Sequence, residues 1–138
     1  MGQTLETAKQ FYTLFAAGDF AGLNACFDRD CKTVTPSGTM NVEEHEQFGR
    51  AFKSALADAR MEIVKTVESG EEVFVEGRFR GTHTADLVSP QGTIPASGKK
   101  LDLPYADYFR VKNGKIVEHH VFWDQVGMMA QLGAGPAH

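Results

Sequence analysis

The spacing of apolar residues changes once along this chain, near residue 60, and this change limits the folds that the chain can adopt. Before it, apolar side chains recur every three or four residues, which predicts helices over residues 5–17, 20–27 and 42–57. After it, apolar and polar residues alternate, as in strands with one buried face. Helices and strands that occupy separate parts of a chain indicate an α+β fold. The expected strands are a short one at 33–35 and an antiparallel meander at 61–67, 73–83, 101–111 and 115–123.

Local signals mark the ends of these elements. Asn41 followed by Glu44 forms a capping-box pattern, which predicts the start of the third helix. Residues 69–71 and 112–114 have turn composition between strands. Residues 85–99 contain two prolines and two glycines, which predicts a long irregular connection of the kind that is functional or mobile.

Composition excludes several classes of protein. The chain has 138 residues and a net charge of −4, and its 14 basic residues are scattered, so we expect no binding to nucleic acid. No apolar stretch approaches the roughly 18 residues that a membrane span needs, and no signal peptide is evident. Two cysteines are too few for a disulfide scaffold. We expect one cytoplasmic domain over residues 1–133, no association with membranes, and a flexible tail at 134–138.

The last two long strands bring an aspartate and a histidine to one face. The more apolar face of each strand is expected to point inward, and it carries Asp107 on one strand and His119 on the other. A three-residue loop at 112–114 would set Asp107 opposite His119, whereas a two-residue type I′ turn would set it opposite His120. We favour the three-residue loop, because it agrees with the inward face.

A third titratable residue, His83, ends the inward face of strand 73–83. Asp107, His83 and His119 would also form a metal-binding set of two histidines and one carboxylate. Nothing else in the chain supplies the partners that orient metal ligands, so we expect no metal and no other cofactor. A strongly curved sheet wrapped around a long helix forms a cone, whose open end is a pocket.

Five segments of the chain form a recognisable set, namely 11–19 (FYTLFAAGD), 81–84 (GTHT), 107–111 (DYFRV), 113–119 (NGKIVEH) and 124–133 (DQVGMMAQLG). Together they resemble the SnoaL-like polyketide cyclases, which belong to the superfamily with the nuclear-transport-factor-2-like cone fold. This resemblance spans nearly the whole chain and implies a strongly curved, mainly antiparallel sheet wrapped around N-terminal helices.

The resemblance implies a cofactor-free cyclase or isomerase that acts on a small apolar compound with a carbonyl or enol group. Asp107 would be the acid/base for an intramolecular aldol reaction, assisted by His83 and His119. An aspartate among aromatic side chains is costly to ionise, which suits proton transfer. The residues expected to line the ligand pocket are Tyr12, Phe15, Thr35, Phe52, Phe79, Tyr105, Phe109, Val121 and Trp123.

Two activities of the superfamily are disfavoured by the residues present. Ketosteroid isomerase chemistry needs a carboxylate near Thr35, and this chain has none there, while Phe11 stands in place of the first-helix tyrosine with Tyr12 adjacent. Epoxide hydrolysis needs an aspartate where this chain has Val121. Two alternatives to the cyclase stay open, namely a non-catalytic ligand-binding domain and a cofactor-free hydrolase with a histidine-activated water.

The outward face of the predicted sheet mixes aromatic residues with arginine. This composition is typical of interfaces between protein chains, so we expect a homodimer formed through this face. The residues concerned are Phe74, Arg78, Tyr108, Arg110 and Phe122.

Overall fold

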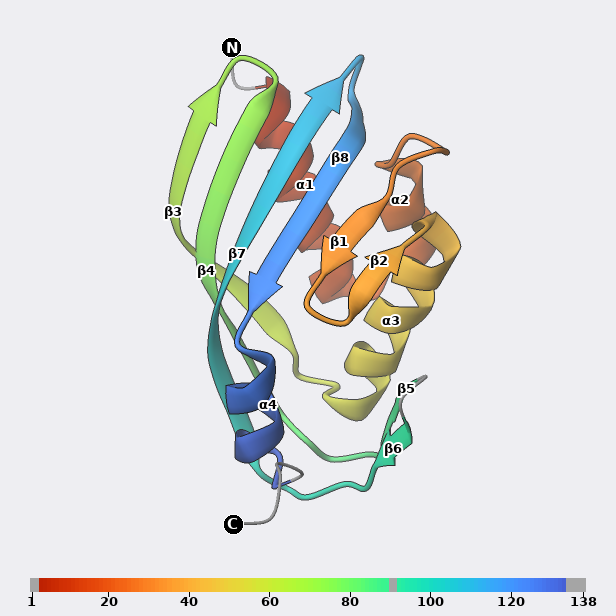
Figure 1. The fold of residues 1–138 in the computed structure, drawn as a ribbon, viewed down its shortest axis with the longest axis vertical. Helices are drawn as coiled ribbons and strands as arrows, with labels where there is room; N and C mark the ends of the chain where they lie inside the picture. The colour runs from red at the N-terminus through yellow and green to blue at the C-terminus, as the bar shows by residue number, and fades with distance from the viewer. Residues whose placement is uncertain (1–2, 90–91, 134–138) are drawn as a thin grey trace.

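A computed structural model describes residues 3–89 and 92–133 of the chain (Figure 1). The predicted tail at 134–138 lies outside the described residues. The helices are α1 (Gln3–Ala17), α2 (Phe20–Ala25), α3 (Val42–Ala55) and α4 (Gln125–Gln131). The strands are β1 (Thr33–Thr35), β2 (Gly38–Met40), β3 (Arg60–Ser69), β4 (Glu72–Thr82), β5 (Leu87–Ser89), β6 (Gly92–Ile94), β7 (Lys100–Lys112) and β8 (Lys115–Trp123).

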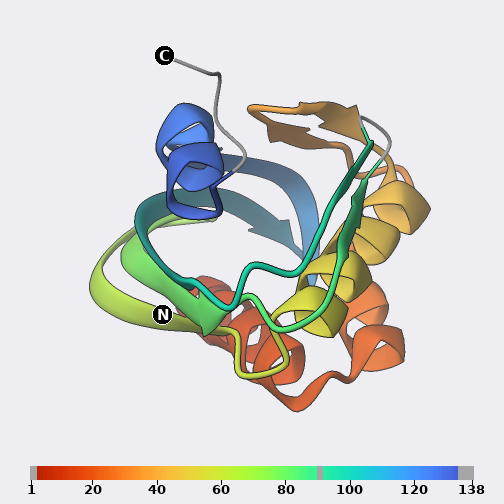
Figure 2. The same ribbon diagram turned by 90° about the horizontal axis from the view of Figure 1, so that it is seen from below.

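The main sheet has the strand order β2-β1-β8-β7-β4-β3, and β5 pairs with β6 in a separate small sheet. All neighbouring strands pair antiparallel except β1 and β8, which run parallel to each other. Figure 2 shows that the sheet bends into an arc with the N-terminal helices on its concave side, where α1 packs against β3, β4 and β7. The α+β class and the cone-like arrangement predicted from the sequence are confirmed.

The predicted helix ends are close to those observed. Asn41 caps α3 through a full capping box, because its side chain accepts from the Glu44 backbone while the Glu44 side chain accepts from the Asn41 backbone. The helix ends at Ala55, two residues before the predicted end. The segment 85–99 is less irregular than predicted, because it contains the β5–β6 pair.

The pairing of Asp107 across β7 and β8 differs from the pairing that either turn would give, because Asp107 lies opposite Val121. Lys112 pairs with Lys115, so the turn has two residues, Asn113 and Gly114, both at positive φ. The prediction of a three-residue loop is wrong.

A β-bulge beside the turn then changes the pairing. Val111 pairs with Ile116 but Arg110 pairs with Glu118, so Val117 is the extra residue on β8. One extra residue shifts the strand by one position and exchanges its two faces. His119 therefore points inward as predicted, although it lies opposite Phe109 and Asp107 lies opposite Val121.

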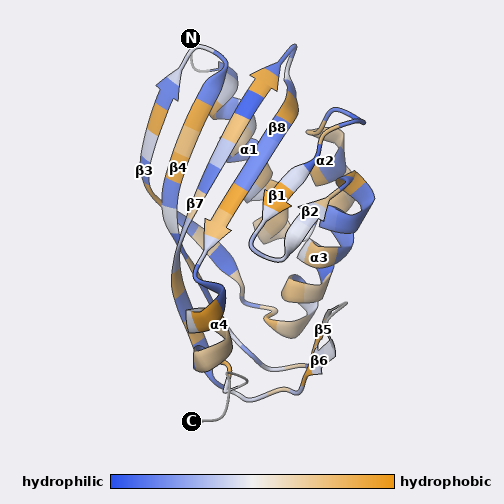
Figure 3. Ribbon diagram, in the orientation of Figure 1, coloured by the Kyte–Doolittle hydropathy of each residue, from blue (hydrophilic) through white to orange (hydrophobic). Residues whose placement is uncertain are grey.

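Buried residues alternate with more exposed ones along most of β4 and β7, and Figure 3 shows hydrophobic and hydrophilic residues along these strands. The buried side encloses mostly apolar side chains, with Asp107 and His119 among the few polar residues there, each 1% exposed. Buried polar groups are costly without hydrogen-bond partners, so their surroundings matter for both stability and function. Within residues 3–89 and 92–133, no helix combines the length and apolar character needed to cross a membrane.

We expect Gly77→Ala to destabilise the protein by about 2 kcal/mol, because an added methyl group overpacks this position. A Cβ on Gly77 would lie 2.3 Å from the Glu62 backbone oxygen and 2.5 Å from the Tyr105 hydroxyl. Urea denaturation measures the change. Glu76→Ala, at the neighbouring exposed position, is the matched control, and equal stability of the two variants would contradict this account of the packing.

Candidate functional site

A cavity opens between the concave face of the sheet and helices α1–α3. Its space, including the open mouth, is about 780 Å³, which suits a small organic molecule. Most of the side chains around it are aromatic or aliphatic. The lining residues are Phe11, Phe15, Phe20, Leu23, His45, Phe48, Gly49, Phe52, Met61, Phe79, Leu103, Tyr105, Asp107, His119, Val121, Trp123 and Met128.

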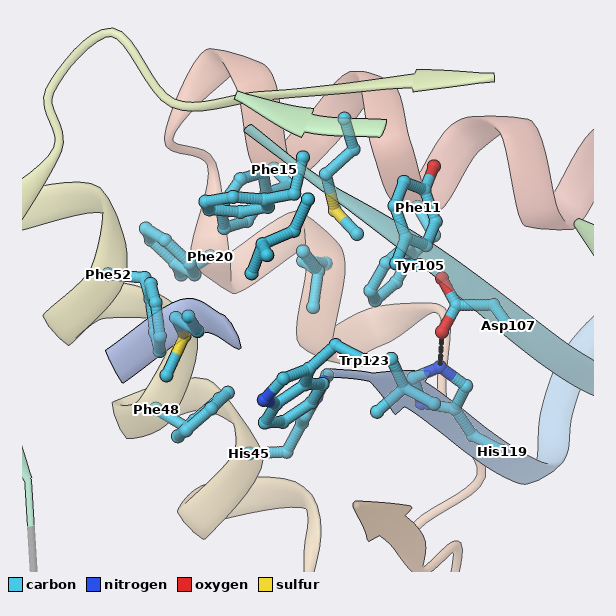
Figure 4. Close-up of a pocket in the computed structure, with 17 residues that line it drawn as sticks. Phe11, Phe15, Phe20, His45, Phe48, Phe52, Tyr105, Asp107, His119 and Trp123 are labelled. Atoms are coloured by element: carbon cyan, nitrogen blue, oxygen red, sulfur yellow. Dashed lines mark hydrogen bonds and ion pairs between the residues drawn. The ribbon is translucent and has the colours of Figure 1, made fainter. Parts of the chain in front are cut away.

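The cavity has an aromatic side and a polar side. In Figure 4, Phe48 and Phe52 lie on one side of the cavity, and Asp107 and His119 lie on the other. Phe48 stacks on Trp123 with ring centroids 5.6 Å apart and an interplanar angle of 21°. No lysine or arginine is among the described residues that line the cavity.

The polar side is a chain of hydrogen bonds through Asp107. His119 Nε2 lies 2.9 Å from Asp107 Oδ1, and the Tyr12 hydroxyl donates to Asp107 Oδ2. On the other edge of the imidazole, His119 Nδ1 lies 3.0 Å from Thr33 Oγ1. A neutral His119 with its proton on Nε2 satisfies this arrangement, because it donates to the carboxylate and accepts from the threonine. Helix α1 and strands β1, β7 and β8 thus meet at one carboxylate.

Packing holds the His119 ring in this orientation. The ring stacks on Phe109 with centroids 4.5 Å apart and an angle of 5°, and Phe11 and Phe27 contact it from other sides. Both of its nitrogens already have partners, so His119 is poorly placed to activate a water. Its effect is to position Asp107.

Two tyrosines lie next to the carboxylate. Burial and the negative charge of Asp107 raise the pKa of Tyr12 well above its ordinary value, and the same two causes raise the pKa of Tyr105. Both phenols therefore keep their protons at physiological pH. The Tyr105 hydroxyl is buried and has no hydrogen-bond partner in the described part of the chain.

His45 is a second imidazole in the cavity, and it comes from α3. Its ring centroid lies 5.3 Å from that of His119 and 6.1 Å from that of Phe11. Burial, and secondarily the charge of His119, lower the pKa of His45 to about 3. His45 is not among the residues predicted for the site, although it lies three positions after Val42 and three before Phe48 on the same helix face.

Most of the predicted pocket residues line the cavity, and three others have different roles. Tyr12 reaches the site through its bond to Asp107, and Phe109 is fully buried against His119. Thr35 bonds to the backbone of the β1–β2 turn and does not line the cavity. The predicted residues that line it are Phe15, Phe52, Phe79, Tyr105, Val121 and Trp123, together with Asp107 and His119.

The structure does not bring His83 to this group. His83 is fully buried beyond the end of β4, where its Nδ1 lies 2.9 Å from Ser97 Oγ, and it does not line the cavity. Of the expected set of one aspartate and two histidines, the structure brings together Asp107 and His119, and His45 is the second imidazole that lines the cavity. Across residues 3–89 and 92–133, no group of three or more His, Cys, Asp or Glu residues is arranged to hold a metal.

Comparisons with known proteins agree with this architecture. The sequence profile of the SnoaL-like domain matches residues 8–119. No protein with a curated description matches the chain.

Several solved structures share the fold over nearly their full length. A provisionally assigned polyketide cyclase, IdmH from Streptomyces antibioticus, is 25% identical with a TM-score of 0.79, covering 95% of this chain and 99% of its own. A SnoaL-like polyketide cyclase from Jannaschia, also provisionally assigned, is 18% identical with a TM-score of 0.83, covering 97% and 94%. AclR from Streptomyces galilaeus, a provisionally assigned hydroxylase, is 15% identical with a TM-score of 0.83, covering 99% of both chains.

The low pKa of His45 makes stability depend on pH in a defined way. In the unfolded chain His45 has its ordinary pKa of 6.5, whereas in the fold its pKa is about 3. As the pH falls below about 6.5, the unfolded state binds a proton that the folded state does not, so the free energy of unfolding decreases until the pH is below about 3.

We expect wild type to lose about 1–2 kcal/mol more stability than His45→Gln between pH 7.5 and pH 5. Urea denaturation of both proteins at a series of pH values measures this difference. The two curves should run parallel above pH 7.5, which serves as the internal control. Parallel curves down to pH 5 would show that the neutral form of His45 is not favoured by the fold.

Proposed function

The chain belongs to the family of SnoaL-like domains, and from this premise we propose that it binds a neutral, largely apolar carbonyl compound and closes a ring in it, in line with the provisional polyketide cyclase names of two similar structures. In this proposal Asp107 is the acid/base of an intramolecular aldol reaction, and no cofactor takes part. The observation that carries the proposal is the position of Asp107 at the polar side of an otherwise aromatic cavity.

The hydrogen bonds of Asp107 leave it able to accept a proton. A carboxylate has about four lone-pair sites, and Tyr12 and His119 occupy one on each oxygen. These two donors stabilise the ionised form and fix the plane of the carboxylate. A hydrogen on a ligand carbon can approach the remaining lone pairs from the cavity, as general base catalysis requires.

The charges around the cavity favour an uncharged ligand. Asp107 is the acidic residue among the lining side chains, and no lysine or arginine of the described residues lines the cavity to balance an anionic ligand. A phosphate or carboxylate inside the cavity would meet a carboxylate without a cation nearby. The stacked rings of Phe48 and Trp123 suit a flat, apolar ligand body.

The reaction conserves atoms and charge without a further reactant. Asp107 takes a proton from the carbon next to a carbonyl, and the electrons of the broken C–H bond move to the carbonyl oxygen to form an enolate. The enolate carbon attacks a second carbonyl of the same molecule and forms the ring C–C bond. The resulting alkoxide then takes the proton back from Asp107.

His119 and Tyr12 act as positioning residues in this scheme, because each holds one oxygen of the Asp107 carboxylate by a hydrogen bond. The hydrolase alternative needs a histidine with a free nitrogen beside a water. Thr33 and Asp107 occupy both nitrogens of His119, which disfavours that alternative.

We expect Asp107→Asn to slow proton transfer by a factor of about 10²–10⁴, the usual contribution of a general base, while ligand binding changes little. The probes are 2-tetralone and benzoylacetone, two neutral aryl ketones with acidic hydrogens next to the carbonyl. Exchange of these hydrogens in D₂O is followed by proton NMR. Binding is followed by the fluorescence of Trp123, the single tryptophan of the chain, which lines the cavity.

Asparagine keeps the size of the side chain, and the Tyr12 hydroxyl can accept a hydrogen bond from its amide, so the variant is expected to fold. Glu76→Gln, on the outer face of β4, is the control for a carboxylate lost elsewhere. Wild-type binding without accelerated exchange would favour a non-catalytic ligand-binding domain. Undiminished exchange in Asp107→Asn would exclude Asp107 as the base.

We further propose that the chain forms a homodimer through the outer face of its sheet. Phe74 and Phe122 are 53% and 54% exposed on this face, beside a groove between β4, β7 and β8. The same strands carry two ion pairs, Arg78 with Asp102 and Arg110 with Glu118, which place both positive and negative charges on this face. An apolar centre with mixed charges around it can match itself across a twofold axis, as a symmetric dimer requires.

Phe74→Asp should convert the dimer to a monomer, because it places a carboxylate at the apolar centre of the interface. Sedimentation velocity at several protein concentrations measures the change in mass. Val88→Asp is the matched control, since Val88 is 62% exposed on β5, which belongs to the separate small sheet. A wild-type protein that sediments as a monomer at all concentrations would exclude the dimer.

A further inference from the structure

We propose that the neutral imidazole of His45 donates a hydrogen bond to the carbonyl oxygen of the ligand and stabilises the enolate that forms there. This inference rests on the proposed function and adds a second ligand-contacting residue to it. It also defines the ligand more closely, as a ketone whose oxygen points toward α3 while its acidic carbon points toward β7.

The position of His45 suits this role. His45 enters from α3 and Asp107 enters from β7, and both line the same cavity (Figure 4), so one small ligand in it can reach both. Phe11 stacks against the His45 ring and Phe27 contacts it edge-on, with centroids 6.1 and 5.5 Å away. The ring of His119 lies 5.3 Å away at an angle of 81°. Its aromatic neighbours hold His45 in place without using its polar atoms.

The imidazole nitrogens of His45 make no hydrogen bond to any other described residue. Its lowered pKa has only burial and the charge of His119 as causes. Half-buried polar groups normally find a partner, so an unpaired imidazole at a cavity wall is a candidate for ligand binding. The polar side chains around it are already committed. Both nitrogens of His119 have partners, and the indole N–H of Trp123 donates to Gln125 at 2.6 Å.

Tyr105 is the other lining residue with an unpaired donor, and its surroundings distinguish it from His45. Its hydroxyl packs against the backbone of β3 and β4, close enough that a Cβ on Gly77 would lie 2.5 Å from it. The hydroxyl thus occupies the space above Gly77. His45 remains the donor whose polar atoms are free for a ligand.

The charge state of His45 matches the chemistry. The titratable groups that face it are His119 and, bonded to His119, Asp107. Burial and the charge of His119 keep its pKa near 3, so it is neutral at physiological pH. A neutral imidazole N–H is a much weaker acid than an enol, so it can stabilise a developing enolate oxygen without giving up its proton.

The test compares two ligands of the same shape that differ in one oxygen. 2-Naphthol has a hydroxyl in place of the enolate oxygen, and naphthalene lacks it. Binding is measured by quenching of Trp123 fluorescence in the Asp107→Asn background, where the amide stands for the protonated Asp107 that follows proton transfer. We expect a second substitution, His45→Phe, to weaken 2-naphthol binding about tenfold and to change naphthalene binding less than twofold.

Two control variants separate the hydrogen bond from packing. His45→Gln keeps an N–H donor and should restore part of the preference for 2-naphthol. His120→Phe replaces a histidine on the outer face of β8 and should change neither affinity. The preference should be equal at pH 5.5 and pH 8, because the donor is neutral at both. A preference found only at pH 5.5 would overturn the neutral donor in favour of an imidazolium.

The outcome also separates this inference from the proposed function. If His45→Phe leaves 2-naphthol binding and ketone exchange unchanged while Asp107→Asn abolishes exchange, the proposed function stands and the inference about His45 fails. If His45→Phe removes the preference for 2-naphthol while wild type shows no exchange, His45 is a ligand-binding residue in a protein without the proposed activity.

Discussion

The rest of the site depends on the hydrogen bonds to the Asp107 carboxylate, which is buried in an apolar interior. A buried carboxylate is costly unless donors surround it. Tyr12 on α1 and His119 on β8 are those donors, and Thr33 on β1 holds the far side of His119. These residues are distant in the sequence, so the same hydrogen bonds join the helix layer to the sheet and orient Asp107, the proposed acid/base. Stability and chemistry therefore share one set of contacts.

The inward position of His119 shows how far alternation along a strand predicts a site. The inward face of β8 was predicted correctly, but neither of the two turns considered places Val121 opposite Asp107, as the structure does. Asn113–Gly114 is a typical sequence for the two-residue turn that forms, and that turn alone would point His119 outward. The extra residue of the bulge, Val117, turns His119 back to the inward face. A bulge is a property of the pairing between two strands, which the pattern within one strand does not contain.

Two histidines differ from the prediction in opposite ways, since His83 was expected in the cavity but lies outside it, and His45 lines the cavity but was not expected there. His83 continues the inward face of β4, but it lies beyond the cavity and bonds to Ser97 in the connection whose course the sequence does not indicate. His45 was missed, although its spacing from Val42 and Phe48 places it on the buried side of α3. A polar residue within an apolar stripe marks a position where the fold tolerates a polar group inside. That signal was present in the sequence.

The arrangement of donors explains how proton transfer can proceed in a cavity without a cation. When Asp107 takes a proton from the ligand, the negative charge moves from the carboxylate to the ligand oxygen, and the total charge of the cavity stays the same. The equilibrium then depends on the donors at the two ends of this movement. In the proposed reaction, Tyr12 and His119 stabilise the charge before transfer, and His45 stabilises it afterwards. Because burial penalises a charged imidazole, a neutral His45 is the donor that this cavity can hold beside the ligand oxygen.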